Sequence, residues 1–315
     1  MQRFEVPLKT TGEVVTRRVV AMGATAELMI VGGDAPALVE WAVDRLARLE
    51  ASWSRFRADS ELRRLDGHAG TGAVVVSPDL VDAIGRALSL WYVTDGRFDP
   101  TVRCALEELG YDRTFREVAP TGPALPHLPY PTRGCDGVQV DREHSTVTLP
   151  EGVALDLGGV GKGLAADLVA TGLVERGASG ACIGLGGDVR VAGSPADGDA
   201  WQIRVEDPLD ESRTMCTRRL SDDAIVTSTT RFRRWTRGGT ALHHLIDPFT
   251  GAPADRGVTA VVAQAETAWW AEGVAKAALV AGVESGLELL ERLGVAALMV
   301  DARGEHHCTD NWEQT

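Results

Sequence analysis

The stretch Val153-Ala-Leu-Asp-Leu-Gly-Gly-Val-Gly-Lys-Gly-Leu-Ala-Ala-Asp167 decides how the rest of the chain is interpreted. It begins like a short apolar strand, passes through four closely spaced glycines and continues as an alanine-rich helix. Glycines let a backbone turn tightly and approach a ligand. A strand followed by a helix N-terminus offers free amides and the positive end of a helix dipole to an anion. The stretch therefore predicts either an anion site near Asp156 and Lys162 or a tight turn that binds nothing.

Two common phosphate-binding motifs do not fit the glycine clusters. A P-loop requires Gly and then Ser or Thr at the positions of Asp156 and Gly163. The second cluster, Gly184-Leu-Gly-Gly-Asp-Val-Arg190, has Val189 where the dinucleotide fingerprint requires its last glycine. Neither cluster identifies a nucleotide-binding fold by itself.

Composition restricts the class of protein. The 315 residues are 44% hydrophobic and 24% charged, which is typical of a globular chain of one large or two smaller domains. The net charge of −13 argues against nucleic acid as a partner, because that function needs a basic face. A local cluster of amides and a lysine still suffices for a small anionic ligand.

Cysteine spacing and hydropathy bear on location. The five cysteines form no Cys-x-x-Cys pair, so the sequence predicts neither a disulfide framework nor a zinc site. The first seven residues lack the apolar core of a signal peptide, and no run approaches the roughly 20 apolar residues of a membrane helix. We therefore expect a cytoplasmic protein with reduced thiols and no membrane insertion.

Hydrophobic periodicity predicts an α+β fold of mixed sheets and packed helices. Gly-, Pro- and Ser-rich turns separate the segments, and Asp59 and Ser77 are expected to cap helices. The predicted strands are 17–22, 26–31, 138–140, 146–149, 181–185, 189–192, 201–206, 224–227, 258–263 and 295–300; the predicted helices are 36–49, 80–94, 163–176, 268–281 and 283–293. Residues 48–57 and 231–239 are expected to form basic turns. Residues 117–137, with five prolines and three glycines, are expected to be an irregular excursion. The chain is expected to be a single domain over 1–315, either as one unit or as two interlocked lobes.

An ordered series of short motifs extends over most of the chain, about residues 22–280. The series comprises Met22-Gly23, Phe56 to Leu62, Asp95-Gly-Arg-Phe-Asp-Pro-Thr101, Asp156 to Gly163 with Asp167, Gly186-Gly-Asp188, Ser228, and His244-Leu-Ile-Asp-Pro-Phe-Thr-Gly251. In this order the motifs resemble those of the FAD:protein FMN transferase (ApbE-type) family. Any one motif is weak, and the complete series is a strong signal.

The resemblance implies an α+β fold that holds FAD in an extended cleft. Family enzymes cleave the FAD diphosphate with the help of Mg²⁺ and attach FMN to a Thr or Ser of an acceptor protein. The cofactor contacts implied by the resemblance are Met22, Phe56, Arg97, Phe98, Asp99, Gly158, Leu164 and Ile246; the glycine clusters add Asp156, Lys162, Gly186, Gly187 and Asp188. Aromatic rings at Phe56 and Phe98 suit ring stacking, and glycines suit a diphosphate.

His244 matches the family histidine before the Ile-Asp-Pro motif. A neutral imidazole can accept a proton from an attacking hydroxyl or steady a leaving phosphate. The alternative is a core histidine that is hydrogen-bonded to backbone. Asp247, in the same motif, is expected to stabilise the turn before Pro248.

The chain departs from the family at the implied metal site. That site uses a backbone carbonyl, here Gly161, and an Asp and a Thr that are replaced by Glu272 and Lys276. Glu272 can still bind Mg²⁺, but a charged ammonium has no lone pair. Lys276 then either forms a helix pair with Glu272 or stands in place of the metal. The leading function is flavin transfer with Glu272 and Lys276 beside His244; the alternatives are a non-catalytic or redox FAD-binding protein and an FAD diphosphatase.

Overall fold

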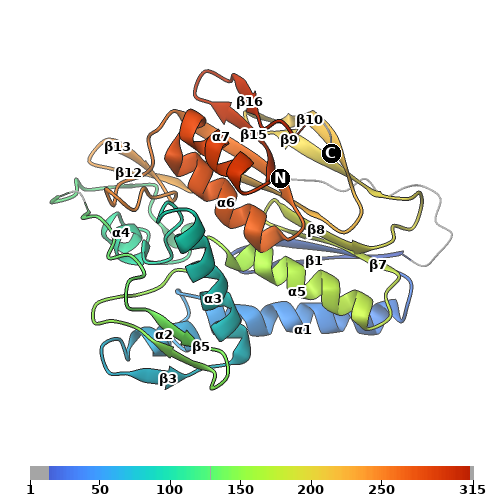
Figure 1. Ribbon diagram of the computed structural model, residues 1–315, viewed down its shortest axis with the longest axis horizontal. Coiled ribbons are helices and arrows are strands. Elements are labelled where there is room, and N and C mark those ends of the chain that lie inside the picture. The colour runs from blue at the N-terminus through green and yellow to red at the C-terminus, as the bar shows by residue number, and fades with distance from the viewer. Residues whose placement is uncertain (1–13, 128, 313–315) are drawn as a thin grey trace.

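An eight-stranded antiparallel sheet forms the centre of the computed structural model, which describes residues 14–127 and 129–312 (Figure 1). The strands lie in the order β1-β2-β7-β8-β11-β14-β15-β16. Their bounds are β1 Val14–Ala21, β2 Ala24–Val31, β7 Gly180–Leu185, β8 Asp188–Gly193, β11 Ala224–Thr229, β14 Val258–Ala265, β15 Ala296–Asp301 and β16 His306–Cys308. The sheet thus joins strands from the first and last parts of the described chain, and the predicted α+β fold is confirmed.

Alternation along the strands gives the sheet two buried faces. In β2, Leu28 and Ile30 belong to the larger core, whereas Met29 and Val31 belong to a second core on the opposite face. Successive side chains of a strand point to opposite faces, so one apolar strand supplies both cores.

Helices cover the face that contains the larger core. Their bounds are α1 Ala35–Trp53, α3 Pro78–Val93, α5 Gly161–Glu175, α6 Ala268–Ala281 and α7 Val283–Arg292. Figure 1 shows α5 between α1 and α6, and the buried sides of all three belong to this core. The Asp34 carboxylate accepts the Ala37 amide to cap α1, and Ser77 caps α3 in the same way through Leu80. Residues 48–53 continue α1 instead of forming the expected turn.

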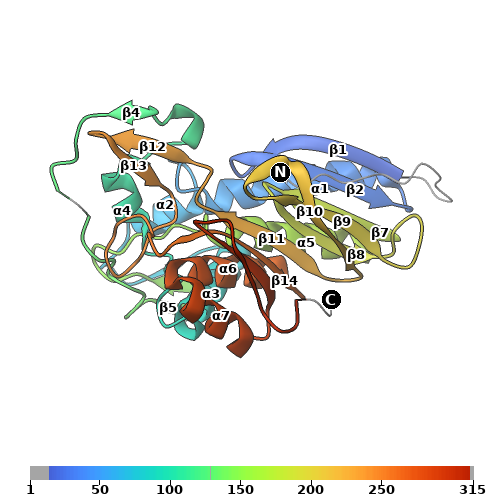
Figure 2. The ribbon, with the colours of Figure 1, turned by 90° about the horizontal axis from the view of Figure 1, so that it is seen from above.

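A two-stranded ribbon covers the second face. It pairs β9 Trp201–Asp207 with β10 Asp210–Leu220 in antiparallel register with bulges (Figure 2). Trp201, Ile203 and Val205 of β9 point into the second core. The sequence analysis did not predict β10, whose polar residues carry no clear two-residue apolar alternation.

The remaining short elements form two three-stranded sheets and short helices at one end of the molecule. Their bounds are α2 Glu61–Asp66, β3 Ala73–Val75, α4 Arg103–Glu108, η1 Phe115–Glu117, β4 Thr121–Gly122, β5 Gln139–Asp141, β6 Thr146–Thr148, β12 Arg234–Arg237 and β13 Thr240–His243. A third core joins α4 to the β12–β13 hairpin, where the Trp235 indole donates to the Leu109 carbonyl at 2.7 Å. Residues 231–239 are thus partly strand, with the hairpin tip at Gly238 and Gly239.

Two other expectations have definite outcomes. Ser60, not Asp59, caps α2, because its hydroxyl accepts the Arg63 amide at 3.1 Å while Asp59 pairs with Arg57. The described residues of 117–137 contain little regular structure beyond β4, as expected. No helix among the described residues is both long and apolar enough to span a bilayer. The first seven residues, on which the signal-peptide argument depends, lie outside the described part.

Candidate functional site

A cavity of about 600 Å³ lies where the ends of α1, α5 and α6 meet the lobe built by α4 and the β12–β13 hairpin. This volume is within the range of small-molecule sites, roughly 300–1,000 Å³. Seven cationic side chains line the cavity against three carboxylates (cations Arg55, Arg57, Arg97, Arg116, Lys162, Arg233 and Lys276; carboxylates Glu50, Asp99 and Asp156). A chain with a net charge of −13 thus concentrates positive charge at one place, which favours an anionic ligand.

Backbone strain also gathers at the cavity. Four described residues other than glycine have a positive φ, and two of them, Met22 (52°) and Arg233 (49°), line it. Such conformations cost free energy and tend to occur at functional sites. Neither Arg116 nor Arg233 has an ion-pair partner among the described residues, so both guanidinium groups are available to a ligand.

The glycine-rich stretch forms the floor of the cavity, although its first part is not a strand. Residues 153–157 have no strand partner; the Asp156 amide donates instead to the Pro100 carbonyl at 2.7 Å. The Asp156 carboxylate then accepts the Gly158 amide at 2.6 Å and closes the turn before α5. The predicted strand was wrong because Val153, Leu155 and Leu157 bury their side chains in the core from an extended loop.

The N-termini of α5 and α6 are capped by each other. Neither Val160 nor Thr267, the local N-cap residues, provides a side-chain cap. Glu272 of α6 accepts the Gly163 amide of α5 at 2.8 Å. Asp167 of α5 accepts the Ala268 and Trp269 amides of α6, both at 2.9 Å. The anion that the helix N-terminus was expected to attract is therefore, at Gly163, a carboxylate of the chain itself.

Gly163 makes this reciprocal capping possible. A Cβ at Gly163 would lie 2.5 Å from the carbonyl carbon and oxygen of Ala268, so the two helix starts are in backbone contact. Gly163 therefore serves helix packing and does not line the cavity, unlike Gly158, Gly159 and Gly161.

Four ionisable groups cluster at the floor of the cavity, where two lysines line it and two carboxylates lie behind the lining. The Lys162 ammonium lies 2.6 Å from Asp188 Oδ2 and also contacts Glu272 Oε1, which accepts from Lys276 at 2.9 Å. Glu272 is fully buried and Asp188 is 2% exposed. Burial opposes the charge of Glu272, but the two ammonium groups outweigh it and lower its pKa to about 2. Burial and the Glu272 charge raise the pKa of Asp188, while its carboxylate and Glu272 raise the pKa of Lys162 despite burial.

Lys162 and Lys276 differ in what they offer a ligand. Lys162 lines the cavity but contacts two carboxylates, and it lies against Gly186, where an added Cβ would be 3.4 Å from Lys162 Cδ. Lys276 contacts one carboxylate, and its stem lies 3.6 Å from the position of a Cβ on Gly159. The Lys276 side chain therefore lies beside the glycine turn, and its ammonium has N–H donors that remain available to a ligand.

The two adjacent histidines have different surroundings. His243 is held by backbone: its Nε2 lies 3.1 Å from the Ala254 carbonyl, and its Nδ1 accepts the Leu245 amide at 3.3 Å. His244 lines the cavity, and its buried Nδ1 has no hydrogen-bond partner in the part of the chain that the structure describes. Burial, followed by the charge of Arg233, lowers the pKa of His244 well below its usual value. The imidazole is therefore neutral and able to accept a proton near pH 7. The alternative interpretation of His244, a core histidine hydrogen-bonded to backbone, does not hold for its Nδ1; among these two residues it describes His243.

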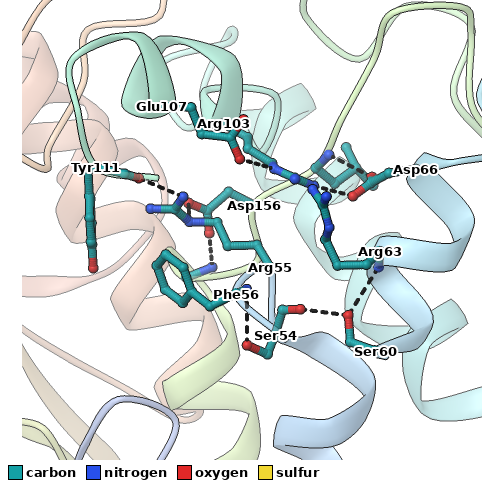
Figure 3. A network of polar contacts seen from close by, with 12 residues as sticks. Ser54, Arg55, Phe56, Ser60, Arg63, Asp66, Arg103, Glu107, Tyr111 and Asp156 are labelled. Carbon is teal, nitrogen blue, oxygen red and sulfur yellow. Dashed lines mark hydrogen bonds and ion pairs between the residues drawn. The ribbon is translucent and has the colours of Figure 1, made fainter. Parts of the chain in front are cut away.

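An arginine that packs against two neighbouring aromatic rings forms one wall (Figure 3). The Arg55 guanidinium carbon lies 4.1 Å from the Phe56 ring centroid and 4.5 Å from that of Tyr111. Its Nε is 2.9 Å from Asp156 Oδ2, and its Nη1 donates to the Tyr111 carbonyl at 2.8 Å. Asp156 therefore fixes this wall and the glycine turn together. The sequence analysis missed Arg55 and Tyr111; a charged residue between Trp53 and Phe56 is a signal that could have indicated the first.

The polar loop after α3 forms another part of the lining. Arg97, Phe98 and Asp99 all line the cavity. Asp99 Oδ1 accepts the amide and the hydroxyl of Thr101, both at 2.7 Å, and Oδ2 accepts the Thr132 hydroxyl at 2.5 Å. The Asp99 carboxylate thus organises its loop with donors of the chain.

Most residues singled out from the sequence meet at this cavity. Those lining it are Met22, Phe56, Arg97, Phe98, Asp99, Asp156, Gly158, Gly161, Lys162, His244, Ile246 and Lys276. Glu272 and Asp188 lie directly behind the lining, in contact with Lys162. Leu164 is buried in the larger core, and Gly186 and Gly187 form the positive-φ turn between β7 and β8. Asp247 stabilises its turn as expected, accepting the Phe249 amide at 2.9 Å.

The model of the ApbE family matches residues 22–299 of the chain. The chain belongs to the ApbE family. It is 30% identical to the FAD:protein FMN transferase of Treponema pallidum over 275 residues, which cover 81% of this chain and 74% of the relative. The FAD:protein FMN transferase of Vibrio cholerae is 28% identical over 261 residues, covering 82% and 78%. The crystal structure of the ApbE protein of Thermotoga maritima superposes with a TM-score of 0.83 at 26% identity, covering 96% of this chain and 99% of that one.

The metal-ligating atoms that this ApbE-family chain offers beside Gly161 do not fit a magnesium ion. Glu272 uses Oε2 for the Gly163 amide, while Oε1 contacts both lysine ammonium groups. A divalent cation at this carboxylate would be within contact distance of two positive charges, in surroundings that screen them poorly. The structure does bring Asp301, Glu305 and His307 within reach of one ion, but none of the three lines the cavity.

Proposed function

We propose that this chain is an FAD:protein FMN transferase that binds FAD in the cavity and moves FMN to a Thr or Ser hydroxyl of an acceptor protein. The observation that carries the proposal is a neutral His244, whose buried Nδ1 has no hydrogen-bond partner among the described residues, in a cation-lined cavity of a chain that belongs to the ApbE family. The two curated relatives compared are named for this transfer, not for redox activity or diphosphate hydrolysis.

In the proposed reaction the acceptor hydroxyl oxygen attacks the phosphorus of the FMN half of FAD. A new phosphorus–oxygen bond forms, the diphosphate bridge breaks, and AMP leaves with the electron pair of that bridge. His244 takes the proton of the attacking hydroxyl through a ring nitrogen that has no competing partner among the described residues. The cationic lining, Arg116, Arg233 and Lys276 above all, offsets the negative charge of the transferred phosphate.

The aromatic wall would hold one flat ring system of FAD. Phe56 is 36% exposed beside Tyr111, with ring centroids 5.6 Å apart, so an aromatic face is available to a ligand. Met22, Phe98 and Ile246 supply further apolar lining, and the Gly158–Gly159 turn admits a phosphate close to the backbone. Leu164 and the Gly186–Gly187 turn would act indirectly, by supporting α5 and making room for Lys162.

We further propose a cytoplasmic location. All five cysteines are free, and Cys104 and Cys308 are exposed. Exposed free thiols suit a reducing compartment.

The adjacent histidines allow a matched test. The purified protein is incubated with FAD and the acceptor protein of the Vibrio cholerae relative, and both acceptor mass and released AMP are measured. His244→Asn is expected to slow transfer by about 10²–10⁴-fold, the usual contribution of a general base. His243→Asn is expected to keep transfer within about threefold and to lower the free energy of unfolding by about 1 kcal/mol, since only backbone hydrogen bonds are lost. Wild-type rates in the His244 variant would remove it from the mechanism.

A further inference from the structure

We propose that the Lys276 ammonium is a resident cation for the diphosphate of the nucleotide, so that FAD binding by this chain does not require a divalent metal. The inference rests on the proposed function and adds to it the group that receives the phosphates. It follows from the placement of two lysines and two carboxylates at the floor of the cavity.

Lys276 presents its charge to the cavity. It lies one helical turn after Glu272 on α6, and its ammonium donates to Glu272 Oε1 at 2.9 Å. An ammonium has three N–H donors, and Lys276 has no second carboxylate partner among residues 14–127 and 129–312. Because Lys276 lines the cavity, the remaining donors are available to a phosphate above the Gly158–Gly159 turn.

The two carboxylates hold this charge in place without meeting the ligand. Asp188 and Glu272 do not line the cavity, and their oxygens point to Lys162, Lys276 and the Gly163 amide. A phosphate would therefore meet an ammonium first, with the compensating negative charge behind it. Lys162 is the less suitable ligand, because both carboxylates already engage it.

Both basic residues in this cluster are lysines, a residue type that is rare in the chain. Only three of the 32 Lys and Arg residues of the chain are lysines, and two of them are Lys162 and Lys276. A lysine carries a compact point charge with freely rotating donors, whereas an arginine carries a broad planar fork. A compact charge fits the narrow space between Glu272 and the glycine turn, where the position of a Cβ on Gly159 already lies 3.6 Å from Lys276 Cδ.

Binding measurements test the inference without relying on turnover. Isothermal titration calorimetry with FAD and with riboflavin, which lacks phosphate, is performed in EDTA and again with Mg²⁺. Wild-type affinity for FAD should differ by no more than about twofold between the two conditions. Lys276→Gln should weaken FAD binding in EDTA by about tenfold or more, the loss of one charge-assisted hydrogen bond, and leave riboflavin binding within about twofold.

Two further variants separate charge from fold. Lys276→Arg keeps the positive charge but not the compact shape, so its FAD affinity in EDTA should lie between that of the wild type and that of Lys276→Gln. Arg219→Gln removes the same charge from an exposed position on β10, where it pairs with Asp199, and should change neither ligand's affinity. Thermal unfolding of each variant shows whether a loss of binding reflects a loss of fold.

The outcomes distinguish this inference from the proposed function. FAD binding by the wild type only in Mg²⁺, or an unchanged FAD affinity in folded Lys276→Gln, overturns the resident cation and leaves the transferase proposal standing. Equal weakening of FAD and riboflavin in that variant also overturns it, because the effect would not depend on phosphate. Absence of FAD binding under both conditions overturns the inference and the proposed function together.

Discussion

The N-termini of α5 and α6 use the same device in different surroundings. Each helix start lacks a local side-chain cap and receives a carboxylate from the other helix: Glu272 for α5, and Asp167 for α6. Glu272 lies against two ammonium groups at the floor of the cavity. Asp167 lies away from the cavity, with Arg190 Nε 3.2 Å from its Oδ1.

The difference appears in the two pKa values. The pKa of Glu272 is lowered to about 2, because Lys162 and Lys276 outweigh burial. The pKa of Asp167 is raised to about 6, because burial outweighs its two amide hydrogen bonds and Arg190. A shared capping geometry therefore does not fix the charge of the cap; the neighbouring cations do. These cations surround Glu272, which is the cap that lies next to the cavity.

Removing the cap at the cavity end should have the largest effect. Glu272→Ala leaves the half-buried ammonium groups of Lys162 and Lys276 with one carboxylate, that of Asp188, and frees the Gly163 amide. We expect the free energy of unfolding to fall by about 3–5 kcal/mol, the usual consequence of breaking a buried ion pair from one side. Chemical denaturation at pH 7 measures the change. A loss below about 1 kcal/mol, as for an exposed pair, would show that the cluster is not buried as described.

Lowering the pH should have the second-largest effect on stability, again through Glu272. The pKa of Glu272 rises from about 2 in the folded chain to the ordinary 4.5 on unfolding, so its contribution is complete above pH 4.5 and is lost as pH falls toward 2. Integrated over that window the contribution is about 3 kcal/mol. Unfolding followed from pH 5 downward should show a shallower loss in Glu272→Gln than in the wild type. Parallel curves for the two proteins would contradict the lowered pKa.

The contribution of Asp167, the cap away from the cavity, to the free energy of unfolding should change with pH in the opposite direction and by a slightly smaller amount. Asp167 binds a proton more tightly in the folded chain, with a pKa of about 6 against 3.8, so its stabilising effect is present below 3.8 and is lost as pH rises through 6. The difference between the two pKa values corresponds to about 3 kcal/mol. The stability of the wild type relative to Asp167→Asn should therefore decrease between pH 4 and pH 7. An increase over this range would mean that Arg190, rather than burial, governs Asp167.

Local sequence signals were sufficient for the bounds of α6 and for the Ser77 cap of α3, but not for the caps of α5 and α6. The α6 bounds were predicted correctly as 268–281, because the segment is almost entirely apolar and ends at Gly282. Its cap lies 101 residues earlier, at Asp167, so no window of sequence around Thr267 could indicate it. The expected strand at 153–157 failed for the same reason: apolar spacing shows burial, but only tertiary structure shows whether a strand partner exists.

In the candidate site, too, some contacts could be predicted from the sequence and others could not. The family resemblance singled out His244, the glycine turn and Lys276, which line one cavity, and Glu272, which lies behind its lining. The helical spacing of Glu272 and Lys276 offered their contact as one of two alternatives, and the structure shows that contact. Spacing did not predict that Lys162 would be engaged by Asp188 and Glu272, or that Tyr111 would stack on Arg55. These contacts join segments far apart in the chain.

Reciprocal capping affects the order in which parts of the chain fold during synthesis. The two caps join positions 109 and 101 residues apart, so α5 has no capping carboxylate while only the first two thirds of the chain exist. During synthesis, the start of α5 would remain frayed until α6 leaves the ribosome and docks beside it. Closing these long loops makes the helix pair a late, all-or-none event. Hydrogen exchange at the Gly163, Ala268 and Trp269 amides should therefore slow together, at the moment when Glu272 and Lys276 first reach the floor of the cavity.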